Sequence, residues 1–209
     1  HRLAKIESDF TIWGLINEKS EWRPNVGVDT GWFLGSSVEV ASKWGSDPLS
    51  PHGAMLVSLE GGAGTAEYAR ANLLGSLDIP IVRDMRINLE AGIGTSVGDL
   101  PLQRAWYLGG PSTLRGFPPR VLGGARFARV RGEVARSFSI GDLSLFTDGA
   151  WVPYDHHFDG EAGDHRTLFS GGSGLSILDQ LIHLDVSWNL RYFRLSSVRF
   201  DAYLDLVPF

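Results

Sequence analysis

Apolar and polar residues alternate with period two along most of this chain, and this pattern restricts the possible folds more than any other feature. In the clearest run, 181–193, apolar residues occupy the even positions and mainly polar or charged residues the odd ones. Such alternation predicts a β-strand with one apolar and one polar face. Similar runs predict about ten or eleven strands. They are 10–16, 26–32, 38–40, 55–59, 69–81, 85–93, 130–138, 143–151, 169–177, 181–193 and 198–209.

Charge and strand length favour a membrane barrel over a soluble β-sandwich, which also shows alternation. The polar faces carry charged residues at mid-strand, as a water-filled lumen allows. The opposite faces are almost uncharged over strands of about 10 to 13 residues, the length that a tilted membrane strand needs. The mid-strand charges are Glu90, Glu133, Asp148, Asp185 and Arg191.

The predicted connections also alternate in length. Tight turns at 82–84, 140–142 and 178–180 contrast with long connections at about 96–127 and 153–165. Outer-membrane barrels have short turns on the periplasmic side and long loops outside. We therefore predict an all-β protein, a transmembrane antiparallel β-barrel, with residues 1–209 forming part of one barrel domain.

Composition limits the class of protein further. The 209 residues carry a formal net charge of −5 without a basic block, which argues against nucleic acid as a partner. The sequence contains no run of about 18 apolar residues, so it predicts no transmembrane helix. The chain begins at His1 rather than Met, which indicates a processed or truncated product. The absence of cysteine gives no disulfide argument and does not fix the compartment.

The long connection contains the stretch Tyr107-Leu-Gly-Gly-Pro-Ser-Thr-Leu-Arg-Gly-Phe-Pro-Pro119. Neither a helix nor a strand interior tolerates this mixture of glycine and proline. Long loops between regular strands are usually functional rather than simple connections. The sequence therefore predicts a functional role for this segment.

The segment Leu108-Gly-Gly-x-x-x-Leu-Arg-Gly-Phe117 resembles the motif in the sixth extracellular loop of bacterial surface-antigen barrels. These form the outer-membrane family of BamA and TamA, and two-partner secretion transporters are their relatives. The segment 131–136 resembles the family strand whose glutamate points into the lumen, and 145–149 resembles its Phe-x-Asp strand. Five predicted strands follow the loop, and the chain ends in an aromatic residue, as in the family.

The resemblance implies a set of site residues. Leu114, Arg115, Gly116 and Phe117 form the loop-anchor motif, and Arg115 meets Glu133 and Asp148 in the lumen, with Phe146 alongside. We expect this anchor to contribute about 1–3 kcal/mol to holding the loop, against about 0–1 kcal/mol if the ion pair is merely exposed. Phe209 corresponds to the family's C-terminal signal, but it is out of phase with residues 200–206, so a bulge at Pro208 is needed.

The family barrel has sixteen strands, so this chain is expected to form its C-terminal part. The implied function is assembly or insertion of outer-membrane proteins, or protein translocation, in the outer membrane. The implied partners are membrane lipid or lipopolysaccharide, client outer-membrane or secreted proteins, and upstream POTRA or passenger domains. Two alternatives stay open: a barrel anchor for an upstream enzyme such as a patatin-like lipase, and a dedicated secretion pore.

Three other motifs carry little functional signal. Asp155-His-His-Phe-Asp159 with Asp164-His165 has metal-ligand chemistry but lies in a predicted external loop. The segment 171–175 fails the Gly-x-Ser-x-Gly pattern at its last position, and 92–98 misses the dinucleotide-binding spacing. We therefore expect no metal, no cofactor and no catalytic residue in this chain.

Overall fold

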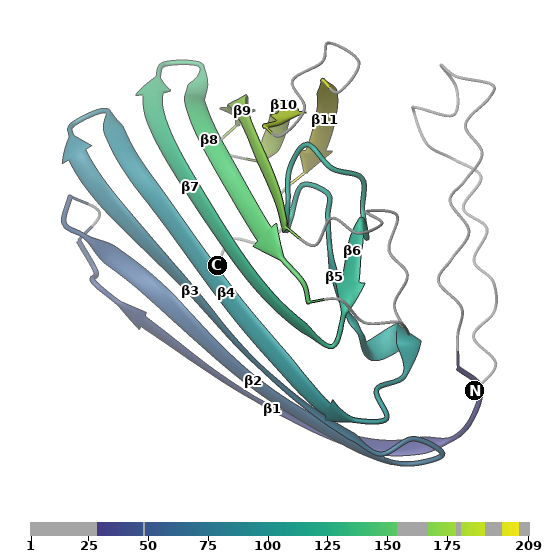
Figure 1. The fold of residues 1–209 in the computed structure, drawn as a ribbon. Coiled ribbons are helices and arrows are strands. Elements are labelled where there is room, and N and C mark those ends of the chain that lie inside the picture. The colour runs from purple at the N-terminus through teal and green to yellow at the C-terminus, as the bar shows by residue number, and fades with distance from the viewer. Residues whose placement is uncertain (1–28, 48, 154–166, 179–180, 191–197, 205–209) are drawn as a thin grey trace.

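The computed structural model describes residues 29–47, 49–153, 167–178, 181–190 and 198–204. Nine of its strands form one curved antiparallel sheet in which each strand pairs with the next along the chain (Figure 1). Among the described residues no helix is long and apolar enough to cross a membrane. The strands of the sheet are β1 (Phe33–Trp44), β2 (His52–Gly64), β3 (Tyr68–Val82), β4 (Met85–Gly98), β7 (Arg126–Phe138), β8 (Gly141–Trp151), β9 (Thr167–Ile177), β10 (Ile182–Asn189) and β11 (Arg199–Leu204).

The all-β prediction is confirmed, and most predicted strands lie inside observed ones. The prediction for 26–32 is wrong in its described part, because residues 29–32 are not in a strand. Their polar groups bond elsewhere: the amide of Trp32 donates to Thr65 Oγ1 (3.2 Å), and Asp29 accepts from the amide of Leu102 (2.9 Å). The predicted strand 10–16, and the ends of 181–193 and 198–209, lie outside the described residues.

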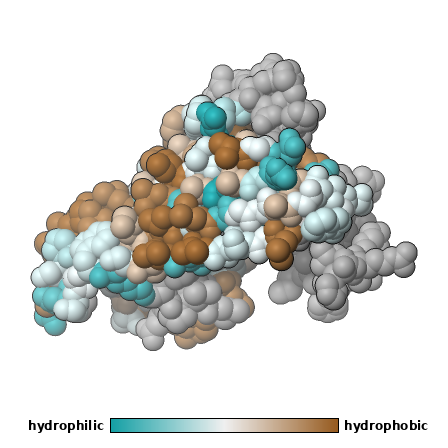
Figure 2. Space-filling view, turned by 90° about the horizontal axis from the view of Figure 1, so that it is seen from below, coloured by the Kyte–Doolittle hydropathy of each residue, from teal (hydrophilic) through white to brown (hydrophobic). Residues whose placement is uncertain are grey.

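Strand register gathers the apolar positions on one surface. Leu73 of β3 pairs with Ile93 of β4, and Leu145 of β8 pairs with Val134 of β7. These side chains point away from the curved interior of the sheet, and Leu145 is 66% exposed. Figure 2 shows apolar side chains gathered into continuous patches of surface. Within the described part of the nine strands, the two charged residues of this outer face are Arg126 and Arg136, at opposite ends of β7.

The inner face carries the polar and charged residues, and the long connection lies against it (Figure 1). This connection runs from 99 to 125, slightly shorter than the predicted 96–127. It contains a short 3₁₀ helix, η1 (Leu102–Arg104), and two strands, β5 (Trp106–Leu108) and β6 (Leu122–Gly124), which pair antiparallel. The sequence prediction missed this pair, because three residues are too few to show alternation.

A buried apolar cluster lies between this loop and the inner face of the sheet. The loop contributes five side chains and the sheet with its adjoining segment contributes four. Leu114, Leu122 and Val152 are fully buried. The loop is therefore packed on the wall rather than projecting into solvent. The members are Leu108, Leu114, Phe117, Val121, Leu122, Phe127, Ala150, Val152 and Leu168.

Candidate functional site

Arg115 lies at the centre of the contact between loop and wall. Its side chain is 4% exposed, and it binds Asp148 of β8 in a bidentate arrangement. Nε is 3.1 Å from Asp148 Oδ2 and Nη2 is 2.9 Å from Oδ1, while the backbone amide of Arg115 donates to Oδ2 at 2.9 Å. Nη1 donates to Glu133 Oε2 of β7 at 2.7 Å. The planar guanidinium thus spans two carboxylates on neighbouring strands.

Phe146 supplies a surface for the same guanidinium. The Arg115 Cζ atom lies 3.5 Å from the centre of the Phe146 ring, a cation–π contact. Phe146 pairs with Gly172 of β9, where a Cβ atom would come within 2.5 Å of the ring. Glycine at 172 therefore leaves the space that the ring occupies beneath Arg115.

The backbone of the motif forms a tight turn that fits a wall of small residues. Gly116 has φ of +79°, a conformation that favours glycine. A Cβ atom there would lie 3.1 Å from the Cβ of Ser170 and 3.3 Å from that of Ser187. Both serines are 0% exposed. Phe117, the last residue of the motif, belongs to the apolar cluster and accepts a hydrogen bond from the Gly110 amide at 3.0 Å.

Two wall arginines also bind the loop. Arg131 Nη2 donates to the carbonyl oxygen of Pro111 at 2.8 Å, and Arg129 Nη1 donates to that of Ser112 at 3.3 Å. Arg131 additionally binds Asp148, with Nε 3.2 Å from Oδ1 and Nη2 3.2 Å from Oδ2. The alternation in the predicted strand 130–138 is consistent with residues 129 and 131 on its polar face, but alternation alone assigns them no contact with the loop.

A second group of contacts fixes the start of the loop. Glu60 of β2 accepts from Arg70 Nε of β3 at 2.8 Å and lies 3.2 Å from Arg104 Nη1 of η1. The Arg70 guanidinium packs over the Trp106 ring, 4.7 Å from its centroid. The pairing of Glu60 with Arg70 could have been inferred from opposite charges on adjacent predicted strands. The contact with Arg104 could not, because a loop has no register.

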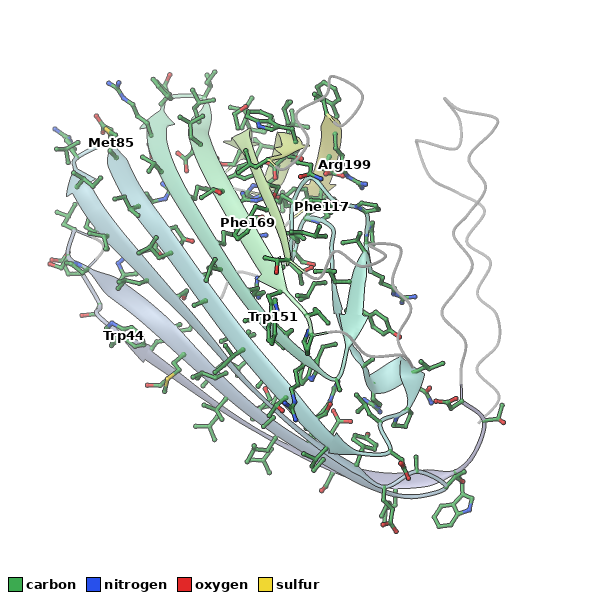
Figure 3. The ribbon with its side chains drawn as sticks, viewed as in Figure 1. Trp44, Met85, Phe117, Trp151, Phe169 and Arg199 are labelled. Atoms are coloured by element: carbon green, nitrogen blue, oxygen red, sulfur yellow. The ribbon has the colours of Figure 1, made fainter. Side chains whose placement is uncertain are left out.

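The electrostatics of the site favour a permanently charged arginine. Burial alone would lower the pKa of the Arg115 guanidinium, but hydrogen bonds and charge from Asp148 and Glu133 outweigh burial and raise it. Both carboxylates are therefore engaged with a fixed cation, and the arrangement is suited to holding a loop in place. Figure 3 shows Phe117 of the motif among the side chains on the inner side of the sheet.

The remaining sequence motifs fall outside this site. The segments 92–98 and 171–175 lie within β4 and β9, so neither adopts the turn that its motif would need. Among the described residues, no group of three or more His, Cys, Asp or Glu could hold a metal ion. The histidine-rich segment 155–165 and the terminal Phe209 lie outside the described residues.

Comparison with solved structures decides the fold. The chain is similar to the crystal structure of BamA from Haemophilus ducreyi lacking POTRA domains 1–3, with a TM-score of 0.59 and 15% sequence identity. The fold is that of a BamA-like barrel wall. The match covers 79% of this chain but 40% of that chain, so the present chain spans less than half of the length of the crystallised BamA chain. No family model and no curated protein matches the sequence.

Proposed function

We propose that this chain is the C-terminal part of an outer-membrane barrel of the BamA and TamA type, which assists insertion or translocation of other proteins. The observation that carries the proposal is the position of Arg115. This loop residue reaches Glu133, Phe146 and Asp148 on two adjacent strands. The family resemblance of the sequence implies this same set of contacts. The BamA-like fold is a second observation that supports the proposed class of protein.

The outer face supports a location in the outer membrane of a Gram-negative bacterium. Its mid-strand positions are apolar or small, and its two charges lie at strand ends. Exposed aromatic residues mark both ends of the strands. Trp44 lies at one end, and Trp151 and Phe169 lie near the long connections (Figure 3). Phe138 is the last residue of β7, next to a short turn. Aromatic girdles flank the apolar band of membrane barrels. Lipid and lipopolysaccharide are therefore the proposed partners of this face.

The proposed mechanism separates a fixed part of the barrel from an adaptable one. The docked loop closes the inner face with an apolar cluster and a buried ion pair, and it braces β7, β8 and β9 against each other. The last described strand, β11, is paired with β10 on one side and with no described strand on the other. A client strand can add to such an edge through backbone hydrogen bonds.

Reconstitution tests this proposal. The full-length protein, purified in detergent and placed in lipid vesicles, should accelerate the folding of an unfolded outer-membrane protein over protein-free vesicles. Arg115→Ala should lose most of this acceleration. Arg120→Ala is the control, because Arg120 is exposed and contacts the Tyr107 ring at 5.7 Å rather than the wall. A protein that inserts stably but leaves client folding at the protein-free rate would instead be an anchor for an upstream domain.

A further inference from the structure

Asp148 is shared by two arginines that belong to different parts of the molecule. Arg115 comes from the loop, whereas Arg131 lies on β7 directly opposite Asp148 in the strand register. Each guanidinium contacts both carboxylate oxygens of Asp148, at distances between 2.9 and 3.2 Å. The Asp148 side chain is 0% exposed, so its charge needs a partner at all times.

We propose that Arg131 is an exchange partner for Asp148, which keeps this carboxylate paired when Arg115 and the loop lift off the wall. Arg131 is fixed by the β7 ladder and stays in place when the loop moves. It already reaches both oxygens that Arg115 would vacate. Glu133, the other partner of Arg115, is 24% exposed and can be hydrated without a substitute cation. The inference rests on this geometry and not on the proposed function.

Arg131 also has an effect in the docked state. Two guanidinium groups that share one carboxylate repel each other, and this repulsion ends when Arg115 departs. Both effects lower the free energy of the lifted loop relative to the docked loop. The hydrogen bond from Arg131 to the Pro111 carbonyl acts in the opposite direction, because it holds the loop down. Removing Arg131 therefore distinguishes two roles. If Arg131 is an exchange partner, the loop lifts less often without it; if Arg131 is only a latch, that is, a residue that holds the loop down, the loop lifts more often.

Arg129 provides a matched comparison on the same strand. It donates to the neighbouring loop carbonyl of Ser112 and pairs with Glu90 at 3.5 Å. It has no hydrogen bond to Asp148 among the contacts of the described residues. Arg129 therefore holds the loop without a hydrogen bond to the carboxylate that Arg115 would vacate, and its removal should make the loop lift more often.

Thiol labelling can measure how often the loop lifts. Ser187→Cys introduces a thiol at a fully buried position beneath Gly116, within 209 residues that contain no cysteine. Any cysteine elsewhere in the full-length protein is first replaced by serine. A maleimide reagent added to the full-length protein in detergent can react only when the loop tip moves away. When labelling is slower than loop closure, its rate reports the population of the lifted state.

In this background, Arg131→Met should slow labelling roughly 2- to 5-fold, the scale of a partly exposed charge interaction. Arg129→Met should accelerate it by a similar factor. Unchanged or faster labelling with Arg131→Met would show that Arg131 is only a latch and would overturn the proposal. Arg131→Gln repeats the test with a smaller change in case the methionine variant fails to fold.

A second arm removes the loop arginine instead of the wall arginine. With Arg115→Met nothing is exchanged at Asp148 and no second guanidinium repels Arg131, so the bond from Arg131 to Pro111 is what acts on the loop. Arg131→Met should then accelerate labelling, reversing its effect in the Arg115 background. The same direction of change in both backgrounds would contradict the proposal, whatever the protein does to its clients.

Discussion

At the scale of single residues, Arg115 joins the loop to two strands of the wall through its ion pairs with Glu133 and Asp148, and we propose that these pairs hold the loop in its docked position. Arg115→Ala should weaken docking by about 1–3 kcal/mol, the value of a charge-assisted hydrogen bond. Limited proteolysis of the folded protein should therefore cut within 107–119 faster. Arg115→Lys should restore only part of the protection, since an ammonium lacks the bidentate fork. Equal cleavage of Arg115→Ala and Arg120→Ala would contradict the anchor.

Gly172 is the second residue whose identity the packing requires. A methyl group there would approach the Phe146 ring within 2.5 Å and also meet the carbonyl of Val186. We expect Gly172→Ala to destabilise the protein by about 1–3 kcal/mol, as overpacking does. Gly132→Ala is the matched control, because its nearest neighbours would lie at 3.7 and 3.8 Å, ordinary contact distances. Urea unfolding of the two variants should separate them, and equal midpoints would show that both the Phe146 ring and the backbone at Val186 can move aside.

Ser187 illustrates what the sequence cannot predict at this scale. The alternation in 181–193 correctly predicts that its side chain faces inward. Alternation says nothing of what covers that face, and Ser187 is 0% exposed because the turn at Gly116 lies against it. The meeting of Arg115 with Glu133 and Asp148 was inferred from family resemblance, since no local pattern joins a loop to strands 18 and 33 positions away.

The orientation of the strands gives a prediction at the scale of the element. Leu73 lies on the outer face in the middle of β3, and Asn72, its chain neighbour, lies on the inner face. Leu73→Lys should cost about 2–4 kcal/mol if the outer face meets lipid at mid-depth. Asn72→Lys should cost far less, because its side chain faces the polar side. Folding into vesicles, followed by denaturant titration, measures both, and equal costs would contradict the assigned orientation.

A strand could be predicted from the sequence where its alternating run is long enough to be recognised. The strands of 11 to 15 residues between β2 and β9 each contain a predicted run. β5 and β6 are stabilised instead by burial of Leu108 and Leu122 in the apolar cluster. That burial depends on the wall beneath the loop, which is formed by residues on both sides of it in sequence. Tertiary contact, not local pattern, determines these two strands.

At the scale of the whole molecule, the nine-stranded sheet formed by the described residues does not close on itself. Nine antiparallel strands in sequential order leave β1 and β11 running in the same direction, so they cannot pair with each other in an antiparallel ladder. Bacterial single-chain barrels have an even number of strands. The complete protein must therefore contribute further strands if the proposed barrel is correct. A lipid environment would not tolerate the open edges.

The most direct test of the account is a structure, by cryo-electron microscopy, of the full-length protein extracted from membranes with detergent. The account predicts a closed barrel in which β1–β4 and β7–β11 form a contiguous part of the wall, with Leu73 facing detergent and Arg115 bound to Glu133 and Asp148 inside. A protein that dissolves without detergent, with the outer face of β1–β4 packed against another protein layer, would contradict it.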